Sequence, residues 1–432
     1  MTETPDRTAL PKVTRRLLPF LFALYIVCFL DRVNVGFAAL QMNQDLGLSP
    51  AVYGFGAGVF FLGYVLFEVP SNLVLSRLGA RVWIARIMIT WGLLASAMMF
   101  VRGPVSLCVL RFLLGAAEAG FFPGMIYYLS GWYPAAERAR AVARFMIAIP
   151  VSGVIGGPVS GALLRLDGWL GLDGWQWLFL LEGLPAVALG VLVLARLPDG
   201  PDDVDWLTSE ERDWLERQLA AEREESGRRH ASGVRLALGS PTVWRLGVLL
   251  LLCNAFGVYV LGLWLPQIVR EVTGLGDFRV GLVTAVPNLV ATVGMVLVGA
   301  HSDRTGERLL HVAGCATAAA VGFVASAWLH SPVGVVLALS VAAAGLLSSH
   351  GPFWPLPSSF LSGSAAAGGI ALIASIANVA GFLGPYATGL LRGTSGGYGA
   401  GLMVLGLVSL AGAAIAVWLR RDSVLAPQPP TS

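Results

Sequence analysis

The sequence is poor in charged residues. Asp, Glu, Lys and Arg make up 13% of its 432 residues, whereas soluble globular domains carry roughly 25%. So little charge cannot cover the surfaces of the several soluble domains that this length would otherwise suggest. The low charge and the hydrophobic content of 56% also exclude an intrinsically disordered chain. A multi-pass integral membrane protein is the class that fits.

Cysteine is also scarce, which excludes a disulfide scaffold. The four cysteines all lie inside apolar segments, and we interpret them as small apolar helix residues rather than redox or metal ligands: Cys28, Cys108, Cys253 and Cys315. The sequence contains no metal-ligand cluster, nucleophile motif or nucleotide loop. We therefore predict that the protein is not an enzyme and has no catalytic residues, metal, cofactor or nucleic-acid partner.

Apolar runs are what the sequence has in abundance. Crossing a bilayer takes about 20 consecutive apolar residues, and we predict twelve such spans, six before and six after a polar stretch. They lie near 17–41, 53–75, 83–101, 105–129, 144–165, 176–195, 244–268, 280–300, 309–329, 333–356, 365–391 and 400–419. This predicts an all-α integral membrane fold with two six-helix bundles, residues 1–196 and 244–432.

The polar stretch, residues 197–243, is predicted to be a linker between the bundles. Thr208 and Glu211 have the spacing of a capping box. Leu207, Trp214, Leu215 and Leu219 then recur at helical spacing. We therefore expect a short amphipathic helix that lies on the membrane face or against the bundle.

Positive charge predicts the orientation in the membrane. With the N-terminus in the cytoplasm, most of the 29 Lys and Arg residues lie in cytoplasmic segments, including the linker. Cytoplasmic loops carry an excess of Lys and Arg. We therefore expect an inner or plasma membrane protein with both termini in the cytoplasm.

Two loops in corresponding places of the halves repeat the same pattern. Three residues after the second span correspond, at a constant offset, to three after the eighth: Arg77, Gly79 and Arg81 to Arg304, Gly306 and Arg308. Two halves that descend from one six-helix unit explain this repeat.

The second loop, which also contains Gly299 and Asp303, resembles the signature loop Gly-x-x-x-Asp-Arg-x-Gly-x-Arg of the major facilitator superfamily. The first loop departs from it, with Asn72 in place of glycine and Ser76 in place of aspartate. The resemblance implies the major facilitator fold. It also implies a gating role for both loops, through Gly299, Asp303, Arg304, Gly306 and Arg308 and through Arg77, Gly79 and Arg81.

Motifs inside the spans narrow the resemblance. Asp31-Arg32 in span one, Arg111 and Glu118 in span four, and Gly351-Pro-Phe-Trp354 in span ten are similar to those of the anion:cation symporter family. That family includes transporters of tartrate, galactonate, phthalate, hydroxyphenylacetate and sialic acid. The resemblance implies proton-coupled uptake of a small organic anion by alternating access, with a monomer as the working unit.

The charged residues within spans lie in the first half, so we expect that half to handle charge and protons. A planar guanidinium suits a carboxylate, so Arg32 and Arg111 are candidate substrate ligands. Asp31 and Glu118 are candidate proton carriers. The second half offers neutral or titratable groups such as Asn254 and His350. Tyr64, Trp354 and Asn378 are candidate residues of the substrate cavity.

Several alternatives stay open on sequence alone. Arg111 and Glu118 can also be a static ion pair, Glu68 and Glu182 can be structural, and the part of His350 is undecided. A sugar acid, a hydroxy-dicarboxylate and an aromatic carboxylate all suit paired arginines. The alternatives to symport are a facilitator or exporter of small metabolites, against which the two membrane arginines argue, and a membrane receptor that senses an anion without transporting it.

Overall fold

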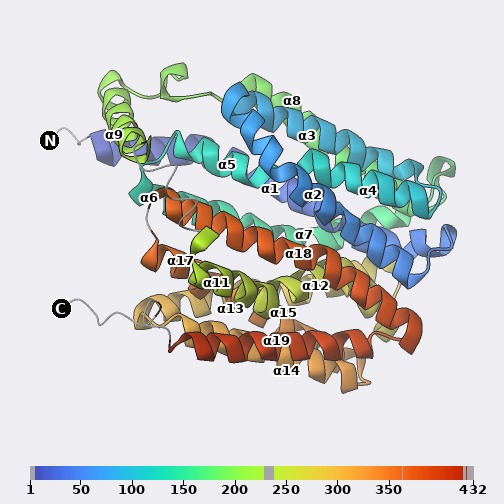
Figure 1. The fold of residues 1–432 in the computed structure, drawn as a ribbon. Helices are drawn as coiled ribbons and strands as arrows, with labels where there is room; N and C mark the ends of the chain where they lie inside the picture. The colour runs from blue at the N-terminus through green and yellow to red at the C-terminus, as the bar shows by residue number, and fades with distance from the viewer. Residues whose placement is uncertain (1–4, 228–237, 362, 422–424, 426–432) are drawn as a thin grey trace.

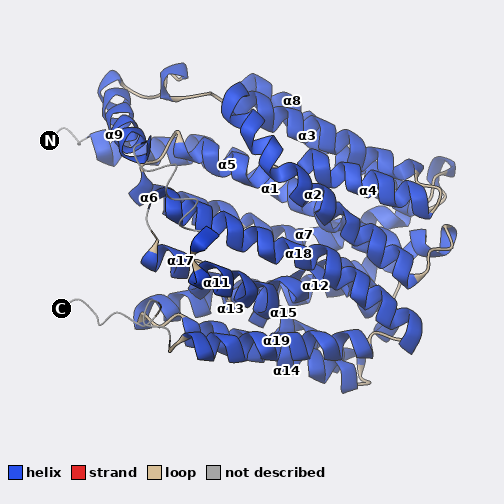
Figure 2. Cartoon of the chain, in the orientation of Figure 1, coloured by secondary structure: helices blue, strands red, loops and turns tan. Residues whose placement is uncertain are grey.

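A computed structural model describes residues 5–227, 238–361, 363–421 and 425. Throughout these ranges the regular elements are helices (Figure 2). Twelve helical segments in them are long and apolar enough to cross a membrane, as predicted. They are Thr8–Asp45, Pro50–Leu75, Ala80–Phe100, Pro104–Ser130, Arg140–Leu166, Gly174–Arg196, Pro241–Thr273, Asp277–Thr305, Leu309–Trp328, Pro332–Phe360, Gly368–Ser395 and Gly399–Leu419.

The twelve spans form two bundles of six. Figure 1 shows one bundle in the upper and the other in the lower part of the view. The first contains α1 (Pro5–Asp45), α2 (Pro50–Leu78), α3 (Ala80–Ala97), α4 (Pro104–Glu118), α5 (Phe121–Ser130), α6 (Ala135–Met146), α7 (Ala148–Leu163) and α8 (Gly174–Arg196). The second contains α11 (Pro241–Leu250), α12 (Phe256–Thr273), α13 (Asp277–Thr305), α14 (Leu309–Trp328), α15 (Pro332–Ser348), α16 (His350–Phe353), α17 (Pro355–Phe360), α18 (Gly363–Ser395) and α19 (Gly399–Leu419). The predicted fold class is confirmed.

Three spans are interrupted near the middle of their length. Span four breaks between α4 and α5 directly after Glu118, at Gly120, whose φ of 87° is left-handed and favours glycine. Span seven contains a π-helical segment, Leu251–Ala255, a distortion that often marks functional sites. Span ten breaks between α15 and α16, at Ser349.

Close helix packing in the first bundle depends on small residues. A Cβ atom added to Gly115 of α4 would lie 1.9 Å from the carbonyl oxygen of Phe60, and one added to Gly63 of α2 would lie 2.2 Å from that of Phe112. Glycine therefore lets the backbones of α2 and α4 touch, as at small-residue interfaces of membrane helices. This contact places Arg111 and Glu118 beside α2.

The linker contains helix α9 (Ser209–Gly227), which packs against the first bundle (Figure 1). Thr208 and Glu211 form the capping box, each accepting a hydrogen bond from the other's backbone N–H. Lys12 of α1 forms an ion pair of 2.8 Å with Glu211. The rings of Trp132 and Trp206 stack with their centroids 5.9 Å apart. We expected this helix either on the membrane face or against the bundle, and in the structure it packs against the bundle.

The repeated loops share a backbone feature. Gly79 and Gly306 end α2 and α13 with positive φ values of 87° and 68°. The N–H of each donates to the carbonyl four residues earlier, of Leu75 and Ser302 respectively, at 3.0 Å. Glycine is favoured wherever φ is positive, which explains why it recurs at both positions.

Candidate functional site

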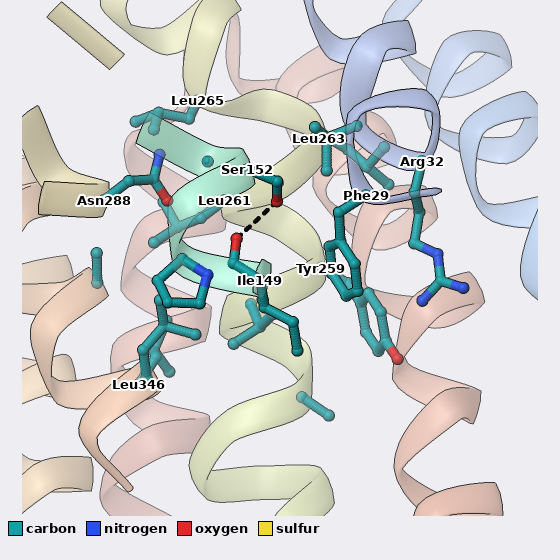
Figure 3. Close-up of a pocket in the computed structure, with 18 of the residues that line it drawn as sticks. Phe29, Arg32, Ile149, Ser152, Tyr259, Leu261, Leu263, Leu265, Asn288 and Leu346 are labelled. Carbon is teal, nitrogen blue, oxygen red and sulfur yellow. Dashed lines mark hydrogen bonds between the residues drawn. The ribbon is translucent and has the colours of Figure 1, made fainter. Parts of the chain in front are cut away.

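A cavity of about 290 Å³ lies between the two bundles (Figure 3). Its wall is mostly apolar and includes Phe29 of α1, Ile149 of α7 and Leu261 of α12. The polar side chains in the wall come from both bundles, and the main ones are Arg32, Asn254, Tyr259, Asn288, His350 and Asn378. A mostly apolar wall with a few polar groups is typical of a small-molecule site.

Arg32 is the one permanently charged residue among those that line this cavity. Its Nε donates to Glu118 Oε1 at 3.0 Å, and its Nη2 contacts the same oxygen. Glu118 is 1% exposed and also accepts a hydrogen bond from the Cys28 thiol at 3.3 Å. Glu118 thus lies behind Arg32, which separates it from the cavity.

Aromatic rings surround the Arg32 guanidinium. Its Cζ lies 5.1 Å from the ring centre of Phe29, 5.3 Å from that of Tyr64 and 5.8 Å from that of Phe60. These contacts are attractive cation–π interactions. Tyr64 is buried and is not part of the cavity wall, so the structure places it beside Arg32 rather than facing the cavity.

Arg111 lies apart from the cavity. It is fully buried, its Nη2 donates to the carbonyl oxygen of Ala57 at 3.1 Å, and its Cζ lies 4.8 Å from the ring centre of Phe60. Its Nε and Nη1 have no hydrogen-bond partner among the described residues. Both guanidinium groups therefore contact the Phe60 ring, and the structure does not bring Arg32 and Arg111 together in one open site.

Asp31 points into the first bundle. Its Oδ2 accepts from Trp91 Nε1 at 2.8 Å and its Oδ1 from Asn34 Nδ2 at 3.4 Å. Glu182 of α8, also buried, accepts from Ser160 at 2.7 Å. Within the described ranges neither carboxyl group forms an ion pair. Asp31 and its sequence neighbour Arg32 thus have different surroundings.

Trp354 and Asn378, which the sequence suggested as candidate residues of the substrate cavity, both line this cavity. Asn378 Oδ1 accepts from the Tyr259 hydroxyl at 2.6 Å, and the ring of Tyr259 packs on Phe61 with centroids 4.4 Å apart. Asn288 of α13 was not singled out by sequence reasoning. The signal that could have found it is its position directly after Pro287 in the middle of an otherwise apolar span.

The bundles meet tightly at the end of the spans away from the two termini. A Cβ added to Gly157 of α7 would lie 2.3 Å from the carbonyl oxygen of Gly281 in α13, and one added to Gly54 of α2 would lie 2.4 Å from that of Pro385 in α18. Gln41 donates to Asp277 at 2.8 Å across the same interface. Backbone contacts and hydrogen bonds therefore close this end of the cavity.

The residues of the two repeated loops are not among those that line the cavity. Asp303 forms an ion pair of 2.6 Å with Arg308 of the same loop, and Arg81 pairs with Asp199 of the linker at 3.1 Å. Gly299 packs against Gly351, where an added Cβ would lie 3.2 Å from its Cα. Arg77 and Arg304 are exposed. A gating role of these residues stays a prediction.

Known proteins are similar to this chain in sequence. The family model described as Major Facilitator Superfamily matches residues 21–385. A protein of Agrobacterium vitis named "Putative tartrate transporter" is 49% identical, over 98% of this chain and 94% of its own. A protein of Acinetobacter baumannii named "Quinolone resistance transporter" is 43% identical, over 94% of each chain.

A solved structure shows the same fold. The crystal structure of a bacterial homologue of the human lysosomal transporter Spinster superposes with a TM-score of 0.78 at 18% identity, over 96% of this chain and 98% of the other. Fold and relatives together define a multi-pass membrane transport protein rather than an enzyme. The chain belongs to the major facilitator superfamily, which confirms the resemblance seen in its motifs.

Proposed function

We propose that this transporter is a proton-coupled symporter that takes up a small organic anion. The observation that carries the proposal is the ion pair between Arg32, in the wall of the central cavity, and Glu118, which lies behind it. A cavity whose one permanent charge is a guanidinium suits an anionic ligand. The relative named for tartrate, an organic anion, supports the same substrate class.

In the proposed cycle, substrate carboxylate and Glu118 compete for Arg32. While Glu118 is ionised, Nε and Nη2 of Arg32 both donate to its Oε1. A proton on Glu118 removes the competing charge, and the guanidinium can then turn its fork to the carboxylate in the cavity. Trp354 and Asn378 would close around the ligand, and Asp31 is kept as a second proton carrier.

Tyr64 and Arg111 would act from behind this site. Tyr64 contacts Arg32 through its ring, and Arg111 is separated from Arg32 by Phe60. A movement of Phe60 would be needed for Arg111 to reach a ligand in the cavity. We therefore propose that Arg111 joins the site in another state of the cycle.

The proposed orientation puts both termini in the cytoplasm, in line with the positive charge of the segments on that side. The tightly packed end of the bundles then faces outward, and the conformation is inward-facing. The two loops with Arg77, Gly79, Arg81, Gly299, Asp303, Arg304, Gly306 and Arg308 would lie on the cytoplasmic side. There they could control the exchange between states, with a monomer as the transporting unit.

The coupling step is tested with Glu118→Gln in proteoliposomes, with labelled tartrate as the first substrate. The amide mimics a permanently protonated carboxyl group. The variant should therefore still exchange labelled for unlabelled substrate, but it should no longer accumulate substrate when an inward proton gradient is imposed. Glu68→Gln makes the same chemical change in the same bundle outside the cavity wall, and should keep both activities.

The outcomes separate the roles of Glu118. Retained accumulation in Glu118→Gln would remove Glu118 as the coupling residue and leave Asp31. Loss of substrate binding together with both activities would make the Arg32–Glu118 pair structural.

An exporter is the second candidate, because the relative from Acinetobacter baumannii is named for quinolone resistance and the cavity wall is largely apolar. Inside-out and right-side-out vesicles separate the two candidates. An exporter exchanges cytoplasmic substrate for external protons. In inside-out vesicles with an acidic lumen it would therefore drive uptake of a quinolone, whereas the proposed symporter would not.

A further inference from the structure

The central cavity has a second polar end, which the proposed pairing of Arg32 with a carboxylate leaves unused. Asn254 of the π-helical segment, Asn288 of α13 and His350 of α16 all line the cavity. We call these three residues the amide–imidazole cluster. All of them belong to the second bundle, whereas Arg32 belongs to the first.

The cluster lies across the cavity from Arg32. Figure 3 shows Asn288 and Leu346 on one side of the close-up and Arg32 on the other, with Phe29, Ile149 and Tyr259 between them. Asn254 is tied to the side of Leu346, because its Nδ2 donates to the Leu346 carbonyl oxygen. His350 lies next to Asn254, with its Nδ1 3.5 Å from Asn254 Nδ2. A ligand that reaches both ends must therefore carry a polar group at each end.

The hydrogen bonds around the cluster determine which atoms face a ligand. Asn254 Nδ2 uses both of its hydrogens, on the Leu346 carbonyl and on Ser349 Oγ. Asn288 Nδ2 donates to the Thr284 carbonyl at 3.0 Å. Because carbonyl oxygens only accept, these bonds identify the amide nitrogens. They leave the side-chain oxygens of Asn254 and Asn288 free, together with the second N–H of Asn288.

The hydrogen bonds around His350 likewise determine which of its ring nitrogens carries the proton. His350 Nδ1 lies 3.2 Å from the carbonyl oxygen of Leu347, and the nearby Asn254 amide has no hydrogen left to donate to it. Nδ1 must therefore carry the proton, which leaves Nε2 as an acceptor. Among the described residues no donor reaches Asn254 Oδ1, Asn288 Oδ1 or His350 Nε2.

The two ends of the cavity thus have opposite character. Arg32 offers donors with a positive charge, and the amide–imidazole cluster offers three uncharged acceptors and one N–H of Asn288. The acceptors can bind hydroxyl groups, whereas a second carboxylate without neighbouring hydroxyl groups would turn its lone pairs toward three acceptors and find one N–H donor. We propose that the cluster binds hydroxyl groups of an anion whose carboxylate pairs with Arg32, so that the substrates are hydroxylated acids rather than plain or aromatic carboxylic acids.

This inference rests on the proposed function, in that it assumes an organic anion at Arg32. It goes further by assigning specificity to three residues of the second bundle. Gly153 of α7 makes room for the cluster from the opposite bundle, since a Cβ added there would lie 2.7 Å from Asn288 Oδ1. The proposed hydroxyl contact therefore forms where the two bundles meet.

The test compares gluconate with hexanoate, which have the same carbon chain and charge but differ in hydroxyl groups. Their binding to the purified full chain is measured by calorimetry, and tartrate and succinate form a second pair. We expect wild-type protein to bind the hydroxylated acid of each pair at least about tenfold more tightly, which corresponds to one or two hydrogen bonds. Asn288→Leu should reduce the preference to within about threefold, mainly by weakening gluconate binding.

Two further variants guard against a purely structural effect. Gly153→Ala keeps the whole cluster but places a methyl group against Asn288 Oδ1, and it should also reduce the preference for gluconate. Thr317→Val removes a polar group from α14, where the hydroxyl only donates to the Ala313 carbonyl outside the cavity wall. It should leave the preference unchanged.

The outcomes distinguish the inference from the proposed function. Equal binding of gluconate and hexanoate by wild-type protein would overturn the inference and leave organic-anion transport intact. Equal weakening of both acids in Asn288→Leu would also overturn it, because the residue would then be structural. Binding of none of the four acids would count against the proposed function itself.

Discussion

At the scale of single residues, the ionic partners differ from what spacing along the chain suggests. Arg111 and Glu118 are seven residues apart, which puts them on one face of a helix. In the structure Glu118 pairs with Arg32 of another helix, and Arg111 donates to a backbone carbonyl behind Phe60. The two arginines should therefore respond differently to the same substitution.

We predict that Arg32→Lys raises the dissociation constant of the transported anion at least about tenfold, because a lysine cannot reproduce the guanidinium fork. Arg111→Lys should change that constant less than about threefold and should lower the transport rate instead, since the side chain lies outside the cavity wall. Calorimetry and counterflow on both purified variants measure the two effects. A large affinity loss in Arg111→Lys would place Arg111 in the resting site.

At the scale of elements, helix α9 is held on the first bundle by a buried carboxylate. Burial alone raises the pKa of Glu211, but hydrogen bonds from Lys12, Thr8 and the backbone of Thr208 outweigh it and lower the pKa to about 2. The ionised form is therefore the one that docks. Because the pKa is depressed, this stabilisation is present above the usual value of 4.5 and is lost as the pH falls towards 2.

We predict that Glu211→Gln loosens α9 at neutral pH. Fluorescence of Trp206, which stacks on Trp132, should report the change. Wild-type protein should show the same change on acidification between pH 4.5 and about 2, and the variant should show no further step there. Glu210→Gln, at an exposed position on the same turn, is the matched control. An identical acid transition in Glu211→Gln and wild type would contradict the role of the Glu211 carboxylate in docking α9.

At the scale of the whole molecule, glycine contacts between the bundles hold the present conformation. Gly157 and Gly281 bring α7 and α13 together at the closed end of the cavity. A larger side chain there would meet backbone, which cannot move aside without separating the bundles. The state in which this end is closed should therefore be sensitive to the size of residue 157.

We predict that Gly157→Val opens this end. Spin labels at Arg102→Cys and Ser331→Cys, in a background without the four native cysteines, report the distance between exposed loops of the two bundles. The distance distribution should shift to larger values in Gly157→Val. Gly314→Val is the control, because an added Cβ meets nothing within 4 Å there. An unchanged distribution in Gly157→Val would refute a role of this contact in closure.

Much of the fold could be predicted from the sequence because it depends on local properties. Whether a segment spans the membrane depends on its length and its polarity, so the twelve spans were predicted. Gly120 lies at the break in span four and Pro352 shortly after the break in span ten, so each break has a residue nearby that disfavours a continuous helix. The cost of burying charge in lipid pointed to Asp31, Arg32, Arg111 and Glu118 as functional candidates.

The arrangement of the site depends on contacts between distant segments. That Glu118 faces Arg32, that Phe60 separates the arginines and that Asn288 reaches the cavity follow from the rotation of each helix and from the docking of the bundles. The helix rotations and the docking of the bundles are determined by close backbone contacts, such as that of Gly115 with Phe60 and that of Gly157 with Gly281. Hydrophobic periodicity carries no information about which of many glycines meet, so the sequence determined the spans and their charges, and the tertiary packing determined their partners.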